Sequence, residues 1–319
     1  MVSRAASDGL GSPRLRVVVT CTQRKTRPVP APLRLRAVTA ARTSARLGNW
    51  ARRLSGSAVG AVPALGLYAG EHWDVARRLS SRRYPKGLRP ELWVCSAGYG
   101  LIPVDAPVVP YSATFSAGAP DSVPGGAEGA ADWWAAMASW EGPAKGPRSI
   151  TALAATAPGA RLLLVLSAPY LRACRDDVLS AIDRLEHPGL LSIVSAGTKA
   201  DKELEGFLLP ADARLQHEFG GTRQALNVRV AEHLLSAGLY EHDEMAEALA
   251  MLLARQPALV RYGRRPATDA EVRAFVREAL LMDVKATHTR LLREFRRSQR
   301  ACEQSRFASL FHLERKAQL

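Results

Sequence analysis

Four short apolar runs recur along the chain, and this repetition strongly limits the folds it can adopt. Continuous runs of this kind, rich in leucine and β-branched residues, are typical of strands that a parallel sheet buries on both faces. Helical patterns separate them, so the sequence predicts an α/β fold with a mostly parallel central sheet flanked by helices. The runs are Leu15–Thr20, Glu91–Ser96, Arg161–Ser167 and Leu190–Ser195; the helical patterns include Leu33–Leu54, His72–Arg83 and Tyr170–Leu185.

The four runs end alike, at a small hydroxyl residue that is usually followed by Ala or Gly. Ligands of open α/β sheets bind at the carboxyl ends of the strands, so we expect a binding crevice there. Helix capping by Ser or Thr is the alternative reading. The glycine spacing matches neither a phosphate-binding loop nor a dinucleotide fingerprint, and no cofactor is expected. The candidate base-binding residues at these ends are Thr22, Gln23, Ser96, Gly98, Tyr99, Ser167, Tyr170 and Gly197.

A long segment rich in Pro and Gly follows the second run, from Ile102 to Gly126. Segments of this length in compact domains are usually functional or disordered, and its aromatic residues favour an ordered loop over the strand ends. Asp105 and Asp121 are the candidate catalytic carboxylates, although either can also be a turn former. The candidates for contact with a base are Tyr111, Thr114 and Phe115.

Two further candidate catalytic residues, Glu71 and His72, lie at a predicted loop-to-helix junction. A helix N-terminus favours anions, and His72 is the histidine best placed for proton transfer. Glu71 is alternatively a plain first-turn acid, and Trp73 beside His72 favours packing. The histidines lack ligand spacing, so no metal site is expected.

The formal charge of +14 is unevenly distributed along the chain. Residues 1–53 carry +11 and residues 255–319 carry +8, which leaves −5 for the middle. Basic ends favour a polyanion such as nucleic acid; codon bias with solvated helix faces, or an anionic membrane, are the alternatives. No apolar run approaches the length of a membrane span, and four cysteines without close spacing indicate reduced thiols in a cytoplasmic protein.

The C-terminal part reads as helical and basic. Short helices, one with clustered arginines at Arg290–Arg300, favour a helix-turn-helix or winged-helix module. Asp269 is a candidate N-cap. The expected organisation is a flexible N-terminus (1–13), an α/β catalytic domain (14–210) and a helical DNA-binding region (211–319). The candidate DNA-binding residues are Arg24, Lys25, Lys199, Lys285, Arg290, Arg293, Arg296, Arg297, Arg300 and Arg306.

The strand-end motifs resemble a known family pattern, CxxxK, LYxG, SAxxGLL and YxxTL in that order. The matching segments are Thr22–Lys25, Leu67–Gly70, Ser96–Leu101 and Tyr111–Phe115. The pattern occurs in YaaA-like proteins and in the core domain of archaeosine synthase, whose topology is similar to that of uracil-DNA glycosylases. The resemblance covers about residues 15–200. The chain departs from it in the first loop, which is less rich in lysine, and it lacks the Asp/His motif pair of standard uracil glycosylases.

The resemblance extends to bacterial antiphage DNA glycosylases that remove glucosylated hydroxymethylcytosine, because the chain adds a basic helical tail. It implies an enzyme that flips a modified base out of double-stranded phage DNA and leaves an abasic site, in antiviral defence. Asp105 or Asp121 would then stabilise the sugar cation or direct water. No obligate protein partner and no membrane partner are expected. A tRNA nucleobase-modifying enzyme and a non-enzymatic DNA-binding stress protein are the alternatives.

Overall fold

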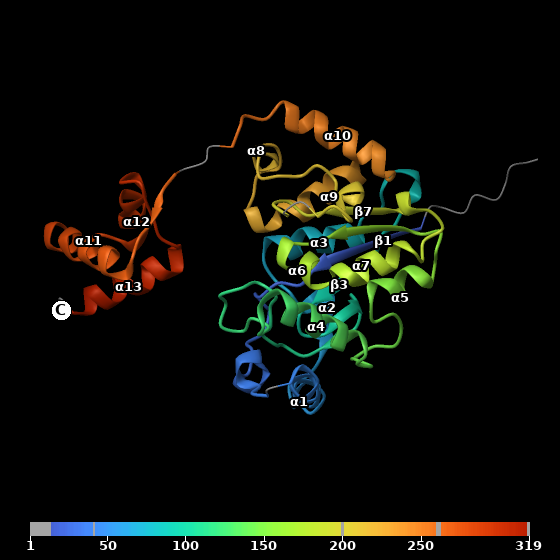
Figure 1. Cartoon of the computed structure of the whole chain (residues 1–319), viewed down its shortest axis with the longest axis horizontal. Helices are drawn as coiled ribbons and strands as arrows, with labels where there is room; N and C mark the ends of the chain where they lie inside the picture. Colours follow the sequence, from blue (N-terminus) through green and yellow to red (C-terminus); the bar gives the residue numbers. More distant parts are fainter. Residues whose placement is uncertain (1–13, 41, 199–200, 260–262, 318–319) are drawn as a thin grey trace, which may run out of the picture. The chain divides into compact units, whose positions relative to one another are not determined.

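A five-stranded, mostly parallel sheet forms the centre of the protein (Figure 1). In this computed structural model, four strands are parallel: β1 (Leu15–Thr20), β3 (Glu91–Ser96), β6 (Arg161–Val165) and β7 (Leu191–Val194). The fifth, β4 (Gly100–Pro103), is antiparallel to β3, and the strand order is β4-β3-β1-β6-β7. The predicted parallel sheet is therefore confirmed, whereas β4 was not expected. The structure describes residues 14–40, 42–198, 201–259 and 263–317.

The central strand explains why the sheet can be read from the sequence. Val17, Val18 and Val19 of β1 are completely buried, because the strand has a neighbour on each side and helices on both faces. In the register, Val18 pairs with Trp93 of β3 and with Leu164 of β6. A strand in this position has no polar face, and so its sequence is continuously apolar.

Helices cover both faces of the sheet (Figure 1). α3 (Glu71–Ser81) packs with α9 (Leu226–Ser236) on one face. The other face carries α4 (Gly126–Ala138), α5 (Ile150–Ala155), α6 (Ala168–Ala173) and α7 (Arg175–Ile182). The chain leaves β1 toward β3 but leaves β6 toward β7, in the opposite direction. The topological switch point, where open α/β sheets usually bind ligands, therefore lies between β1 and β6.

Two predicted helices differ from those observed. Within Leu33–Leu54 only α1 (Thr43–Ser55) is an α-helix, because Leu33 and Leu35 exchange backbone hydrogen bonds with Ser112 of the long loop. The predicted helix Tyr170–Leu185 is divided into α6 and α7 at Cys174, whose backbone is not helical.

The long loop is ordered, as predicted. Its β5 (Pro107–Val108) pairs with β2 (Val62–Pro63), which precedes α2 (Ala64–Leu67). Farther along, Thr114 bridges to Ser122.

The chain divides into two compact units, residues 1–257 and 258–319. α9 and α10 (His242–Ala254) belong to the first unit, since Val230 and Leu249 are buried in its core. α8 (Leu215–Phe219) packs against both of these helices. The predicted boundary after residue 210 is therefore too early, because the segment after it is helical but completes the α/β unit. The predicted flexible N-terminus, residues 1–13, lies outside the described residues.

The second unit, called here the C-terminal module, consists of α11 (Asp269–Met282), α12 (His288–Arg297) and α13 (Gln304–Ala317). A two-residue ladder joins β8 (Arg265–Pro266) to β9 (Arg300–Ala301). Val276, Phe295 and Phe311 lie in its separate core. Thr268, and not the predicted Asp269, caps α11, through a reciprocal capping box with Glu271. No helix in the described part of the chain is long and apolar enough to cross a membrane.

Candidate active site at the strand ends

The loop that leaves β1 is held in place by the segment before α3. The amide of Thr26 donates to the carbonyl of Leu67 at 2.8 Å, and the amide of Ala69 donates to the carbonyl of Arg24 at 3.0 Å. These bonds form an isolated antiparallel bridge between Lys25 and Tyr68. The CxxxK and LYxG segments are thus fixed side by side, and the Lys25 side chain is directed onto the aromatic residues below it.

The Lys25 ammonium group lies against two tyrosine rings. Its nitrogen is 4.5 Å from the ring centre of Tyr111 and 5.2 Å from that of Tyr68, and it donates to the carbonyls of Thr22 and Gln23. Loss of solvent around the ammonium group lowers the pKa of Lys25 to about 8, while nearby Cys21 opposes the shift. A substantial fraction of this amine is therefore unprotonated, and nucleophilic, slightly above neutral pH.

A chain of hydroxyl groups runs beneath the lysine. The Tyr68 and Tyr111 hydroxyls are 3.0 Å apart, and the Tyr111 hydroxyl is 2.7 Å from the Ser96 hydroxyl. Ser96 also accepts hydrogen bonds from the amides of Gly98 and Tyr99, just beyond the end of β3. Burial raises the pKa values of Tyr68 and Tyr111 well above 10, so both phenols stay neutral and can donate or accept a hydrogen bond.

The glycine of the SAxxG motif makes room for this arrangement. A Cβ atom at Gly98 would lie only 2.2 Å from the Tyr111 ring. The Gly98 carbonyl accepts a hydrogen bond from the Trp50 indole at 2.8 Å, which fixes the backbone against the ring. Gly98, predicted to contact a base, instead positions Tyr111.

A second pair of side chains spans the switch point. The Cys21 thiol, immediately after β1, lies 3.2 Å from the Tyr170 hydroxyl on α6. Tyr170 packs edge-on against Phe115, with ring centres 5.0 Å apart, and burial raises its pKa well above 10. We call the residues gathered here the strand-end cluster: Cys21, Lys25, Tyr68, Ser96, Tyr111 and Tyr170.

The two predicted catalytic aspartates do not belong to this cluster. Asp105 is exposed in the turn after β4. Because β4 runs antiparallel and Pro103 pairs with Trp93, this turn lies beside the start of β3, at the edge of the sheet opposite the cluster. Asp121 is buried, but its carboxylate accepts from the Ser112 hydroxyl at 2.7 Å and pairs with Arg36 at 3.2 Å. Its contacts are those of a residue that ties the long loop to the segment before α1.

Glu71 and His72 also have structural surroundings. The Glu71 carboxylate pairs with Arg229 and accepts from the Thr222 amide at 2.8 Å, contacts that lower its pKa. His72 is buried, and burial lowers its pKa to about 4, although backbone groups of Thr20 and Gln224 oppose the shift. The ring is neutral at physiological pH, and its Nε2 has no hydrogen-bond partner among the described residues.

The remaining predicted base-binding residues divide between the rim and the core. Thr22 is half-buried, and its hydroxyl donates to the carbonyls of Arg24 and Ala69, whereas Gln23 is exposed on the loop over Lys25. Beyond β6 and β7, Ser167 is half-buried and Gly197 is exposed. Three others are buried, and their contacts are with the protein: Tyr99 accepts from the Val109 amide, Thr114 accepts from the Ser116 amide, and Phe115 packs on Tyr170 and Trp134. Tyr111, the other aromatic candidate for contact with a base, is likewise buried.

Two members of the cluster were missed as site residues. Cys21 and Tyr68 were not selected from the sequence, although they are the Cys of CxxxK and the Tyr of LYxG. Lys25 was assigned to DNA backbone contact; its side chain is half-buried, with the ammonium group against the rings of Tyr68 and Tyr111. The family pattern itself was the signal that identifies all three.

The predicted DNA-binding residues also separate into groups. Arg24 and Lys285 are exposed. Arg290 pairs with Asp283 and Glu294, Arg306 pairs with Asp269, and Arg300 lies over the Phe295 ring at 4.4 Å. Lys199 lies outside the described residues. Arg293, Arg296 and Arg297 line a hollow in the C-terminal module.

No group of three or more His, Cys, Asp or Glu side chains with the arrangement of a metal site occurs within the described ranges, and all four cysteines are free thiols. Comparisons of the chain with protein-family models, with curated proteins and with solved structures found no match.

Proposed function

We propose that this protein is a DNA glycosylase that removes a modified base, with the amine of Lys25 as its nucleophile. The observation that carries the proposal is the position of Lys25: an amine with a lowered pKa, on two neutral tyrosines, at the carboxyl ends of the parallel strands. Ligands of open α/β sheets bind at this edge. We assign the catalytic role to Lys25 and not to Asp105 or Asp121, because neither carboxylate belongs to the strand-end cluster.

The chemistry follows from the amine. With the target nucleotide drawn out of the duplex, unprotonated Lys25 attacks C1′ of the sugar, and the bond from C1′ to the base breaks. The base leaves with the bonding electrons and takes up one proton, while the amine loses one. Opening of the sugar ring gives an imine between Lys25 and C1′, and the former ring oxygen takes up a proton. Water then hydrolyses the imine, which restores the amine and leaves an abasic site.

The neighbouring hydroxyls support this role. The Tyr68, Tyr111 and Ser96 hydroxyls are buried, neutral and linked to one another, so they support the amine from below without placing a neutralising carboxylate beside it. Thr22 and Gln23 on the rim can contact the base or its substituents. The glucosylated hydroxymethylcytosine of phage DNA is the proposed substrate, on the resemblance of the motifs that form the cluster.

The test is mass spectrometry of bases released from phage DNA, host DNA and tRNA, with borohydride added in parallel to trap the imine. We expect one modified base to be released from phage DNA, and a covalent protein–DNA adduct that maps to Lys25. Lys25→Ala should abolish both. Arg27→Ala, which removes the same charge from an exposed position on the same loop, is the matched control.

Release of a base by Lys25→Ala at the normal rate would overturn the role of the amine. Release from tRNA alone would replace the proposed substrate with RNA. If the protein binds DNA but releases no base from any of these substrates, the proposed enzymatic activity is contradicted. The protein would then be a DNA-binding protein without this activity.

A further inference from the structure

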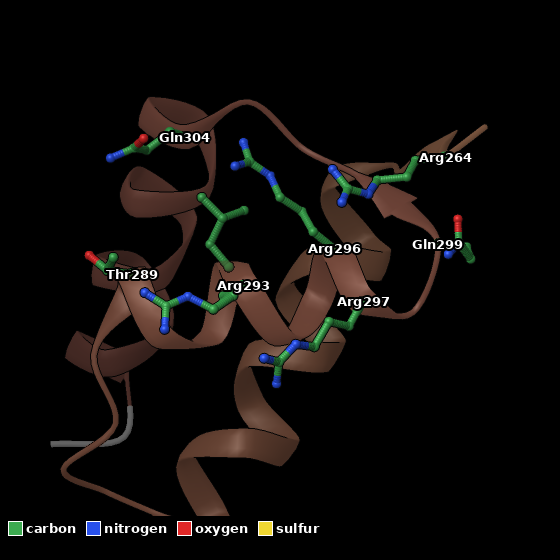
Figure 2. Close-up of a pocket in the computed structure, with 8 residues that line it drawn as sticks. Arg264, Thr289, Arg293, Arg296, Arg297, Gln299 and Gln304 are labelled. Carbon is green, nitrogen blue, oxygen red and sulfur yellow. The ribbon is translucent and has the colours of Figure 1, made fainter. Parts of the chain in front are cut away.

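A hollow of about 560 Å³ lies in the C-terminal module, within the size range of small-ligand sites (Figure 2). Arg293, Arg296 and Arg297 reach it from successive turns of α12. The other lining residues come from the segment before β8, from α12 itself, from the turn after α12 and from the start of α13. The lining residues are Arg264, Thr289, Leu292, Arg293, Arg296, Arg297, Gln299 and Gln304, and no carboxylate is among them.

The charges around the hollow differ from those on the rest of the module. Elsewhere arginines face acids: Arg273 pairs with Glu314, Arg290 with Asp283 and Arg306 with Asp269. Among the described residues, by contrast, the exposed side chains of Arg293 and Arg297 have no acidic partner. Positive charge without compensation on one wall favours an anionic ligand.

The protein itself fixes the orientation of Arg296. Its guanidinium donates to the carbonyl of Cys302 at 3.0 Å, and the side chain is half-buried. Figure 2 shows Arg296 between Arg264 on one side and Arg293 on the other. A planar guanidinium held in this way still has donors for two phosphate oxygens, and its fixed orientation reduces the entropy lost on binding.

Gln299 and Gln304 add a different kind of group. Their side chains are exposed, on opposite sides of the hollow in Figure 2. Gln299 has a φ of +59°, a left-handed conformation that glycine adopts more easily. Side-chain amides form hydrogen bonds with the edges of nucleobases, and most often with adenine. Inorganic phosphate has no such edge. The Leu292 side chain adds an apolar surface against which a base can pack.

We propose that this hollow binds a short segment of a DNA strand, with a phosphate on Arg293, Arg296 and Arg297 and the bases on either side of it at Gln299 and Gln304. The site would anchor DNA through the C-terminal module, independently of any chemistry at Lys25. It differs from a diffuse basic surface because its donors converge on one cavity. The inference therefore stands or falls separately from the proposed glycosylase.

The test measures binding of the full-length protein to a labelled 12-nucleotide mixed-sequence DNA by fluorescence anisotropy. Arg293→Gln/Arg297→Gln removes two charges from the hollow. Arg315→Gln/Lys316→Gln removes two charges from exposed positions at the end of α13 and is the matched control. We expect affinity to fall about tenfold or more in the first variant and about twofold or less in the control. The salt dependence of binding should also weaken in the first variant, by roughly two ions released.

Equal losses of DNA affinity in the two variants would mean that the arginines of the hollow act only through general electrostatic attraction. This result would overturn the proposed site. Heparin, a polyanion without bases, tests the role of the glutamines. Gln299→Ala/Gln304→Ala should bind DNA more weakly but heparin as tightly as the unmodified protein does. An unchanged affinity for DNA in that variant would overturn base contact. Circular dichroism of each variant verifies that the helices remain folded.

Discussion

The ammonium nitrogen of Lys25 lies 4.5 Å from the centre of the Tyr111 ring, although 86 positions separate the two residues in the chain. The same ring packs closely against the backbone at Gly98, where a Cβ atom would lie only 2.2 Å from it. Motifs that follow β1 and β3 and a motif within the long loop thus meet around one aromatic ring. An unpaired cation over a neutral aromatic face is favourable, and it is not neutralised as it would be by a carboxylate.

Lys25→Arg should separate the charge of this residue from its nucleophilicity. Arginine retains the cation over Tyr111 but stays protonated, so base release should fall by several orders of magnitude while DNA affinity changes little. In the unmodified protein, release should increase as the pH rises through about 8, where the amine loses its proton, and then level off. Single-turnover rates between pH 6 and 10 provide the measurement. A rate that falls over this range would contradict an amine nucleophile.

Removing the hydroxyl of Tyr111 should cost more stability than removing that of Tyr68. Tyr111→Phe removes the hydroxyl that links the buried Tyr68 and Ser96 hydroxyls, at a cost of about 1–3 kcal/mol in the free energy of unfolding. Tyr68→Phe should cost less, since Tyr111 keeps its bond to Ser96. Urea unfolding followed by tryptophan fluorescence measures both, because all six tryptophans lie in residues 1–257. A larger loss of stability in Tyr68→Phe than in Tyr111→Phe would contradict the central position of the Tyr111 hydroxyl between those of Tyr68 and Ser96.

The two aspartates of the long loop should behave differently, and neither as a catalyst. Asp105→Ala changes an exposed turn at the far edge of the sheet, so we expect less than about 0.5 kcal/mol of lost stability and normal base release. Asp121→Ala leaves Arg36 unpaired and removes the acceptor of the Ser112 hydroxyl, and should destabilise by about 2 kcal/mol. Loss of base release in Asp105→Ala, with normal stability, would restore the carboxylate mechanism.

His72 should make the α/β unit sensitive to acid. Its pKa is about 4 in the folded protein and 6.5 in the unfolded chain, so the unfolded chain binds more protons between these values. Stability is therefore complete above pH 6.5 and decreases by up to about 3 kcal/mol as the pH falls to 4. Urea unfolding at several pH values, read from tryptophan fluorescence, should show this decrease. It should be absent in His72→Leu and present in the exposed-site control His187→Gln.

The sheet was predictable because its inner strands are buried on both faces, which requires apolar residues along the whole strand. Val17–Val19 are completely buried, so a continuous apolar run identifies the strand. β4 was not predictable in this way: it has four residues and begins at Gly100, whose positive φ reverses the chain directly after β3. Because of that reversal, Asp105 lies beside the start of β3 and not at the carboxyl ends of the strands. The composition of the loop alone could not show this.

The domain boundary failed for a related reason. Helical periodicity in α9 and α10 resembles that of the C-terminal module, and only the burial of Val230 and Leu249 in the core of the first unit assigns the two helices to it. The position of the Lys25 ammonium group against two tyrosine rings is likewise a tertiary property, since it depends on the bridge to Tyr68. Charge counted along a sequence does not distinguish an ammonium group packed on aromatic rings from one in solvent.

Gln299 offers the last test, in which stability and binding should change in opposite directions. Its φ of +59° strains any residue with a Cβ atom, so Gln299→Gly should stabilise the C-terminal module by about 1 kcal/mol. The same change removes one amide from the wall of the hollow and should weaken DNA binding severalfold. Hydrogen exchange of the α11–α13 amides measures the first effect, and anisotropy measures the second. Gln304→Ala, which removes the other amide without relieving strain, should weaken binding but leave exchange unchanged. If Gln299→Gly stabilises the module and binds DNA normally, the residue does not contact the ligand, and the site at the hollow is restricted to its arginines.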